Sequence, residues 1–446
     1  MRILSPPLQN HRWLFLIAFL FTLPGMSQTP DSVLQSAPLD EIVRYTVVHQ
    51  PGVQQARVGE EVIRRTIRGK IADWYPQLNV AYNYQRFFDL QSSVIGGNLI
   101  RFGVDHTSSL QFTGSMTLFN RDVLLAATSA SEVQLQAGQQ TTRTTIEAVV
   151  SVTKAFYDVL ATMQQVKVSE ESIVRLERSL HDARSRYNAG VTDKTDYKRA
   201  TIQLGNARAD LKANEEQLIF KKEYLKTLMG YPLEAELPLL YDTLAMENDL
   251  YIDTLQEINY SQHIEYQLLK TQQELQDDNI KYSYWAYLPS LNLFGTYNLN
   301  YQNNDFGELY NQRYPYSYVG ATLSIPVFQG GKRGIKIREQ KFVKEQLAIR
   351  KEGLEQQLST QHTRALAAYK SNLAAFEAQR ENVALATEVY DVIALQYQSG
   401  VKTYLELTLA ESDLRTTRIN YYNALYRVLA SKLDVQQALG LVEINR

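Results

Sequence analysis

Two stretches in the first third of the chain alternate apolar and polar residues one by one. From Leu78 to Tyr84 every second side chain is apolar, with Asn79 and Asn83 between, and from Ser108 the alternation runs on to about residue 119. A period of two predicts β-strands that have one apolar and one polar face. We therefore expect strands over about residues 76–87 and 108–119.

Elsewhere apolar residues recur at intervals of three and four, which predicts long amphipathic helices. No proline lies between Pro76 and Pro232 or after Pro326, and the tracts are rich in strong helix formers. We expect one helix from about Arg121 to Tyr187. At 1.5 Å per residue it would be ~100 Å long. Two of the apolar stripes are Ile146, Val149, Val150, Phe156, Tyr157, Leu160 and Met163, and Tyr422, Leu425, Tyr426, Leu429 and Leu433.

The same order of elements returns about 210 residues later. Tyr-Pro-Gln-Leu-Asn-Val at 75–80 returns as Leu-Pro-Ser-Leu-Asn-Leu at 288–293, and Tyr-Asn-Ala-Gly-Val at 187–191 as Tyr-Gln-Ser-Gly-Val at 397–401. The chain therefore reads as two repeats, over 28–233 and 234–446. The second repeat should hold strands at about 289–302 and 316–328. Helical hairpins should turn near 188–195 and 398–405, polar loops should join the strands at 88–107 and 302–315, and residues 231–252 should link the halves.

The N-terminus has the pattern of a secretory signal peptide. Arg2 and Arg12 precede an apolar run over 13–23 that is followed by Pro-Gly-Met-Ser. About 11 apolar residues are too few for a membrane span, which needs ~20. We expect cleavage after Ser27, with residues 1–27 removed. No later stretch is long and apolar enough for a spanning helix, so any membrane crossing has to be made by strands.

The amino-acid composition excludes some classes of function and favours a membrane location. The net charge of −2 gives no reason to expect a nucleic-acid partner, and the absence of cysteine excludes disulfides and thiolate metal sites. The chain holds 29 tyrosines, which suit a membrane interface. About half of the aromatic residues near the strands are expected in interfacial girdles; the candidates are Tyr82, Tyr84, Phe87, Phe88, Tyr297, Tyr301, Tyr314, Tyr316 and Tyr318.

Four strands of 10 to 14 residues can cross a bilayer but cannot close a barrel. An open edge in lipid leaves backbone groups without hydrogen bonds, at several kcal/mol each. Identical chains must therefore share one barrel, and the strand count alone allows a dimer or a trimer. An ordinary elongated coiled coil would explain the helices, but it would not explain the strand pair before each helix pair.

The chain resembles the TolC-type outer-membrane factor family in the order and spacing of three features. These are the doubled strand–strand–helix–helix unit, the Tyr-x-x-Gly-Val turns and the segment Ile-Pro-Val-Phe-Gln-Gly-Gly-Lys at 325–332. The resemblance implies an α+β membrane protein of the outer membrane: a homotrimer whose 12-stranded barrel, four strands per subunit, continues into a periplasmic α-helical barrel. It also implies a passive duct that works with a periplasmic adaptor (a membrane fusion protein) and an inner-membrane pump of the RND, ABC or MFS type, in outer-membrane lipid. It implies no enzymatic activity and no cofactor.

The resemblance also suggests a gate at the hairpin tips. Gly190–Val191 and Gly400–Val401 would form the tip turns and contact the adaptor. By resemblance, Tyr397 should hydrogen-bond Asp196.

Lys402 should likewise reach Thr195 of a neighbouring hairpin. Glu406 would form an acidic ring, although Thr403 to Glu406 is also a capping box that acts only on the helix start. Lys402 replaces the family's Arg, and Leu409 stands where a second acid would complete a double ring.

The sequence gives little support for metal binding, phosphate binding, an adaptor role or catalysis. The six histidines are scattered, and the Gly-Gly-Lys-Arg-Gly run at 330–334 lacks the spacing of a phosphate loop. A periplasmic adaptor would carry one hairpin flanked by short β segments, and an enzyme would need a site. Type I protein secretion stays open beside small-molecule efflux, because the cargo cannot be inferred from the sequence.

Overall fold

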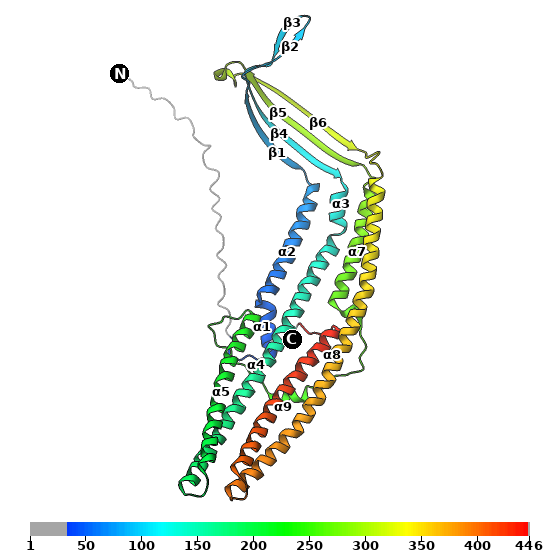
Figure 1. The fold of residues 1–446 in the computed structure, drawn as a ribbon. Coiled ribbons are helices and arrows are strands. Elements are labelled where there is room, and N and C mark those ends of the chain that lie inside the picture. Colours follow the sequence, from blue (N-terminus) through cyan, green and yellow to red (C-terminus); the bar gives the residue numbers. More distant parts are fainter. Residues whose placement is uncertain (1–33, 445–446) are drawn as a thin grey trace, which may run out of the picture.

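The computed structural model describes residues 34–444 as one long, curved molecule, with a β-sheet at one end and helices running away from it (Figure 1). The predicted signal peptide, 1–27, lies outside the described residues. The elements follow the order α1 (Leu39–His49), α2 (Pro51–Ile71), β1 (Gln77–Arg86), β2 (Gln91–Ile95), β3 (Asn98–Phe102), β4 (His106–Phe119), α3 (Arg121–Thr128), α4 (Ala130–Asn188), α5 (Lys194–Met229), α6 (Thr243–Asn248), α7 (Ile264–Trp285), β5 (Ser290–Asn303), β6 (Arg313–Ser324), α8 (Lys332–Gln398) and α9 (Tyr404–Leu439). Three short 3₁₀ turns, Ala72–Trp74, Tyr260–Gln262 and Phe306–Glu308, join them. Within this part no helix is both long and apolar enough to cross a membrane.

The four long strands form one antiparallel sheet in the order β1-β4-β5-β6. The strands from the two halves of the chain meet at its centre, where β4 pairs with β5. Cross-strand partners share a face, and one face of the sheet is largely apolar while the other carries amides, hydroxyls and tyrosines. Gly114 and Gly295 are direct partners on the apolar face. Paired glycines in neighbouring strands let a sheet bend sharply.

The strand bounds lie close to the predicted ranges, with one clear difference at the end of β6. The alternation predicts a strand to residue 328, but β6 ends at Ser324. Pro326 has no N–H to donate and restricts the residue before it, so the ladder stops although the apolar alternation continues.

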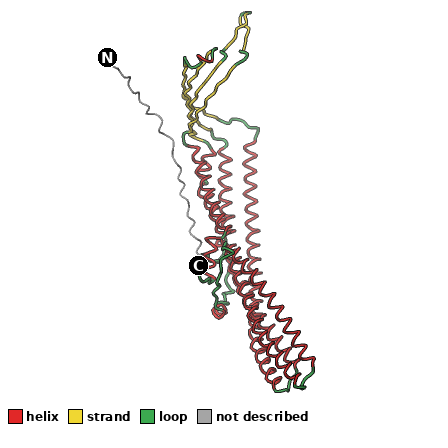
Figure 2. Tube along the Cα trace, turned by 90° about the vertical axis from the view of Figure 1, so that its left-hand side faces the viewer, coloured by secondary structure: helices red, strands yellow, loops and turns green. Residues whose placement is uncertain are grey.

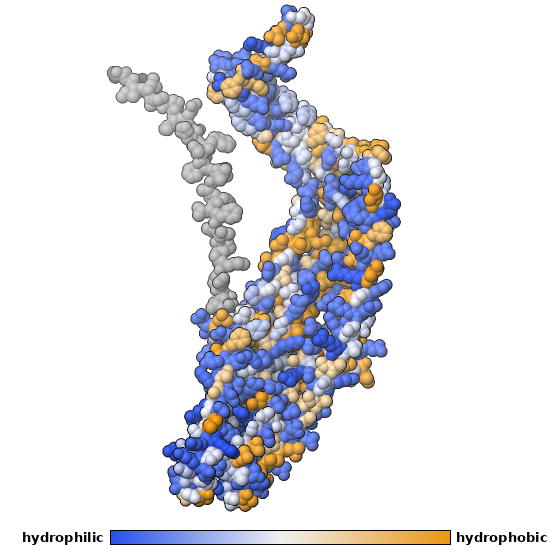
Figure 3. All heavy atoms as spheres, in the orientation of Figure 1, coloured by the Kyte–Doolittle hydropathy of each residue, from blue (hydrophilic) through white to orange (hydrophobic). Residues whose placement is uncertain are grey.

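A polar loop is expected between β1 and β4, over residues 88–107, and the structure gives this segment a regular element of its own. It contains the antiparallel hairpin β2–β3, which turns at Gly96 and Gly97, both with positive φ. This hairpin projects beyond the four-stranded sheet (Figure 1), and its hydrophobic residues reach the surface (Figure 3).

The predicted helix over 121–187 is two helices, α3 and α4, with a break at Ser129. The hydroxyls of Thr128 and Ser129 donate to the carbonyls of Leu124 and Leu125 one turn back. Side chains that hydrogen-bond to the backbone in this way compete with the regular helix and bend it. The apolar period runs through the break, so periodicity alone does not reveal it.

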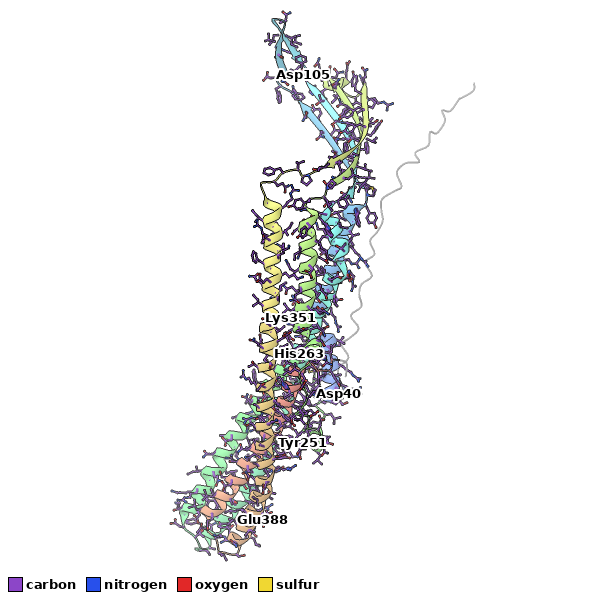
Figure 4. All side chains as sticks on the ribbon, turned by 90° about the vertical axis from the view of Figure 1, so that its right-hand side faces the viewer. Asp40, Asp105, Tyr251, His263, Lys351 and Glu388 are labelled. Carbon is purple, nitrogen blue, oxygen red and sulfur yellow. The ribbon has the colours of Figure 1, made fainter. Side chains whose placement is uncertain are left out.

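The long helices pair as two hairpins, α4–α5 and α8–α9, and α4 runs beside α9. Figure 2 shows the helical part bending away from the axis of the sheet toward the hairpin tips, and Figure 4 places Glu388 near those tips and Asp105 at the opposite end. The main core lies midway along the helices. Its largest fully buried side chains include Phe156, Leu160, Leu225, Tyr369 and Phe376.

The segment that links the halves, 231–252, packs onto this core. Its Leu250 is fully buried, and the Tyr369 hydroxyl donates to the Leu250 carbonyl at 3.0 Å. A single parallel bridge joins Ala37 to Leu239. The two repeats are evident in the order of elements, while their exact boundaries, 28–233 and 234–446, stay predictions.

Candidate gate at the tips of the helical hairpins

Both hairpins turn with the same backbone motif. Gly190 and Gly400 have φ of +72° and +78°, in the left-handed region that glycine adopts without strain. The N–H of Val191 donates to the Arg186 carbonyl at 2.9 Å, and that of Val401 to the Gln396 carbonyl at 2.9 Å. Each closes the end of its helix in the same way, so a glycine is needed at both turns, as predicted. Val191 and Val401 are exposed at the tips.

A small buried cluster holds the two tips together. Ala183 and Ala200 of the first hairpin pack with Tyr397, Tyr404 and Leu407 of the second, and all five are buried. The Tyr397 and Tyr404 rings meet edge to face, with centroids 6.0 Å apart. The cluster lies directly behind the turns, so the hairpins cannot separate at their ends without exposing it.

Arg186, near the end of α4, reaches across to the other hairpin. One of its guanidinium nitrogens donates to the carbonyls of Tyr397 and Gln398, at 2.9 and 2.8 Å. The guanidinium carbon lies 4.7 Å from the centre of the Tyr397 ring. A cation is thereby placed at the negative end of α8, where the last carbonyls lack helical partners.

The hydrogen bond between Tyr397 and Asp196 that the resemblance implies is absent from the single chain. The Tyr397 hydroxyl is buried and has no hydrogen-bond partner among the described residues. Burial raises the pKa of Tyr397, and the Asp196 charge adds to this while Arg186 opposes it.

Lys402, in the turn before α9, binds Glu406 in the first turn of that helix, with Nζ 2.6 Å from Oε1. Thr195, its predicted partner in a neighbouring hairpin, instead donates to the N-cap residue of its own helix: its N–H and hydroxyl donate to Asp193 Oδ1 at 2.9 and 3.1 Å. Within the chain, then, both groups that the resemblance implies in a contact between hairpins are engaged locally.

Glu406 forms the predicted capping box with Thr403. The Thr403 N–H donates to Glu406 Oε2 at 2.9 Å, and the Glu406 N–H donates to the Thr403 hydroxyl at 3.3 Å. Hydrogen bonds from Lys402 and Thr403 lower the pKa of Glu406 from 4.5 to about 2. Glu406 is thus ionised at neutral pH, and it is half-buried at the tip.

Two turns above the tip lies a second link that the sequence analysis did not predict. Glu411 of α9 is buried and accepts from Arg175 of α4 at 2.8 and 3.2 Å and from the Ser172 hydroxyl at 2.7 Å. A bidentate pair of this kind is specific in geometry as well as charge. Further along the same seam, Arg418 pairs with Glu171.

No pattern in the sequence reveals Arg186 or Glu411 as links between hairpins. A basic residue in the last turn of a helix is explained by the helix dipole alone, and Glu411 lies at a position that reads as a solvated helix face. Which residues face the other hairpin depends on how α4 and α9 are rotated about their axes, and this rotation is set by packing.

A four-stranded sheet with one apolar and one polar face, joined to two long helical hairpins, is the architecture of a membrane channel subunit. The model of the outer membrane efflux protein family matches residues 46–231 and 267–441. The chain belongs to this family, and it is an outer-membrane efflux channel protein, not an enzyme.

Known relatives share this architecture along most of the chain. The chain is 24% identical to the outer membrane protein TolC of Vibrio cholerae serotype O1, over 73% of this chain and 75% of that protein. It is 23% identical to the antibiotic efflux pump outer membrane protein ArpC of Pseudomonas putida, over 90% of this chain and 82% of that protein. A crystal structure of CusC matches with a TM-score of 0.72 at 17% identity and covers 90% of this chain and 91% of that one.

Proposed function

We propose that three copies of this chain share one 12-stranded barrel and one helical tunnel, and that the assembly is the outer-membrane duct of a tripartite efflux system. The observation that carries the proposal is the state of the sheet edges. Among residues 34–444, β1 and β6 are the two outer strands and have no partner on their free sides, whereas β4 and β5 are paired on both. Nearly every residue of β1 and β6 is exposed.

An edge of 10 or 12 residues in lipid would leave a row of backbone groups without hydrogen bonds. Pairing β6 of one subunit with β1 of the next removes both edges, and closure of three four-stranded sheets gives twelve strands. The apolar face then meets lipid, and the polar face lines the water-filled duct.

The helices also carry apolar residues that a neighbour would cover. On α8, Ile335, Phe342 and Ile349 follow one another at intervals of seven and are exposed, and on α2 the side chains of Val58 and Val62 are exposed. A repeat of seven along one face is typical of helices that pack along their length. Neighbouring subunits would bury these two stripes in the tunnel wall.

In the proposed system the protein is a passive conduit. A periplasmic adaptor would contact the tips at Gly190, Val191, Gly400 and Val401, and an inner-membrane pump of the RND, ABC or MFS type would supply the energy. Small-molecule efflux is the transport class that we propose, because the names of several relatives describe efflux of antibiotics, toluene or cations.

The assembly is tested by fractionation. Trimers that dissociate only on heating are expected in the outer-membrane fraction, and imaging should show one continuous lumen. Purified protein that stays a single copy in detergent, with no lumen, would contradict the proposal.

The partner is tested by cross-linking. A photoreactive amino acid at Val191 or Val401 should capture the adaptor, whereas the same amino acid at Val94 in the β2–β3 hairpin should not.

We further propose that Tyr397, Asp196, Lys402, Thr195 and Glu406 act in the gate. In the assembled trimer the Tyr397 hydroxyl would gain the partner it lacks in the single chain, and Lys402 could exchange Glu406 for Thr195 of the next subunit. The double variant Tyr397→Phe with Lys402→Ala should raise the conductance of the protein in planar bilayers. Unchanged conductance would remove these residues from the gate and leave the assembly untouched.

A further inference from the structure

Three tyrosines form a column on the polar face of β6. Tyr314, Tyr316 and Tyr318 lie at alternate positions of this strand, so all three side chains point to the same side. The rings of Tyr316 and Tyr318 are parallel within 3°, with centroids 6.4 Å apart. All three are candidates for an interfacial girdle by sequence, but the strand register places them on the face opposite to Tyr82 and Tyr297.

The column continues onto the neighbouring strand. Phe294 of β5 is the direct partner of Gly320 and meets the Tyr318 ring edge to face at 6.1 Å. A Cβ at Gly320 would lie 2.7 Å from the Phe294 ring, so only glycine allows this ring to lie across β6. We call these four residues, Tyr314, Tyr316, Tyr318 and Phe294, the aromatic track.

Tyr316 and Tyr318 contact side chains of β5 and are half exposed. Their direct partners on β5 include Thr296 and Asn298, which are buried although they belong to the polar face. The Asn298 side-chain amide donates to the Tyr316 hydroxyl at 2.8 Å, which fixes that ring. Tyr316 and Tyr318 remain 50% and 51% exposed. A face held in place on one side and open on the other is a preformed stacking surface.

The polar face that surrounds the track carries no charge along the strands. Among the residues of β1, β4, β5 and β6, the charged or titratable bases are Arg86, His106 and Arg313, and the register places all three on the other face. The polar face offers only amides, hydroxyls, small residues and rings. In the proposed trimer the adjoining β1 would bring Asn79, Ala81, Asn83 and Gln85, none of which has a ring to fill the stacking positions.

We propose that the aromatic track binds planar, uncharged aromatic solutes as they pass through the barrel. Such solutes stack on open tyrosine rings, and their polar edges meet the neighbouring amides and hydroxyls. Charged solutes find no complementary charge on this face. The inference rests on the proposed function, because it requires the polar face of the sheet to line the duct.

The test uses 2-naphthol, which is planar and uncharged at neutral pH, and its saturated analogue decahydro-2-naphthol, which is not planar. With single trimers in planar bilayers, 2-naphthol should interrupt the current for longer than the saturated alcohol. Replacing Tyr316 and Tyr318 by Leu together should shorten the interruptions at least about fivefold, since each stacked ring accounts for about two- to tenfold. Tyr297→Leu is the matched control, because Tyr297 is similarly exposed but lies on the apolar face.

A second measurement does not depend on an open tip. In detergent-solubilised protein, magnetisation transferred from the protein to 2-naphthol should fall in the Tyr316→Leu, Tyr318→Leu variant and persist in Tyr297→Leu. Equal responses of the double variant and the wild type, or of the two alcohols, would overturn the track. If the trimers conduct but do not distinguish the two alcohols, the proposed function stands and only the binding by the aromatic track is wrong. If no trimers form, both the proposed function and the binding by the aromatic track are wrong.

Discussion

Arg186 at the end of one hairpin donates to the backbone carbonyl of Tyr397 at the end of the other, at 2.9 Å. The same guanidinium lies over the Tyr397 ring and donates a second hydrogen bond, to the Gln398 carbonyl. One side chain therefore joins the two tips by three interactions. The link uses backbone groups of α8, and it therefore depends on where that helix ends more than on which side chains it carries.

The first prediction concerns this link. Arg186→Ala should raise the conductance of the reconstituted protein, because the tips lose the charged contact that spans the two hairpins. Arg184→Ala is the control, since Arg184 lies two residues away and places its guanidinium over the ring of Tyr197, in its own hairpin. Equal conductance of the two variants would show that the Arg186 contact does not restrain the tips.

A second prediction concerns the buried carboxylate above the tip. Glu411→Ala leaves the largely buried Arg175 without its anion and should lower the free energy of unfolding by about 3–5 kcal/mol. Thermal unfolding followed by circular dichroism in detergent measures the loss.

Two control variants show whether the loss of stability in Glu411→Ala comes from the buried charge. Glu177→Ala removes an exposed pair with Arg208 of similar length and should cost less than about 1 kcal/mol. The double variant Arg175→Met with Glu411→Leu leaves no buried charge and should recover most of the lost stability. If Glu411→Ala and Glu177→Ala cost the same, the buried pair contributes nothing special to the seam.

A third prediction follows from the lowered pKa of Glu406. Its pKa is about 2 in the folded chain and 4.5 ordinarily, so the stabilisation of the α9 start is complete above pH 4.5 and is lost as the pH falls toward 2. The protection factor of the amides in the first turn of α9, which corrects for the intrinsic pH dependence of hydrogen exchange, should therefore fall over that window.

In Glu406→Gln this loss of protection should disappear, because the side-chain amide does not titrate. The start of α5 should keep its own pH dependence in the same variant, since hydrogen bonds from Thr195 lower the pKa of Asp193 there. A pH dependence of α9 that survives Glu406→Gln would assign the effect to another group.

The repeated pattern allowed much of the fold to be predicted from the sequence. The strand alternation, the reversals at Gly190 and Gly400 and the capping box of Glu406 each depend on residues that are neighbours in the chain. The hairpin in the loop 88–107 was missed, although the Gly96–Gly97 pair is a known turn signal between short strands. Strands of five residues carry too little alternation to be recognised with confidence.

The contact of Lys402 with Thr195 of a neighbouring hairpin stays a prediction, because within the single chain Lys402 binds Glu406 four residues away, in the first turn of α9. The links through Arg186 and Glu411 depend on the packing of α4 against α9. Such contacts follow from the rotation of whole helices, which no local pattern encodes.

A fourth prediction compares three glycines that share one backbone conformation. Gly230, Gly440 and Gly190 all have φ near +72°, so alanine costs about 1–2 kcal/mol of left-handed strain at each. The space around them differs. An added Cβ would lie 2.6 Å from the His49 carbonyl oxygen at Gly230 and 3.2 Å from Gln262 at Gly440, and would meet nothing at Gly190.

The order of destabilisation should therefore be Gly230→Ala, then Gly440→Ala, then Gly190→Ala, with overpacking adding about 1–3 kcal/mol at Gly230. Chemical unfolding in detergent gives the three values under one condition. Equal losses would mean that the backbone conformation alone decides them, and that α1 does not press against the end of α5.

The last prediction tests which face of the sheet meets lipid. Val319 on β6 is 89% exposed and lies on the apolar face, opposite Gly295, whereas Thr322 of the same strand lies on the polar face. Arginine near the middle of a lipid-facing strand costs about 2–4 kcal/mol, while in a water-filled lumen it is solvated. Val319→Arg should therefore reduce the yield of heat-resistant trimers in the outer-membrane fraction, and Thr322→Arg should preserve the yield and change the ion selectivity of the duct. The reverse result would mean that the polar face of the sheet, with the aromatic track, meets lipid and that the apolar face lines the duct. This pair of variants therefore decides the orientation of the sheet in the proposed barrel.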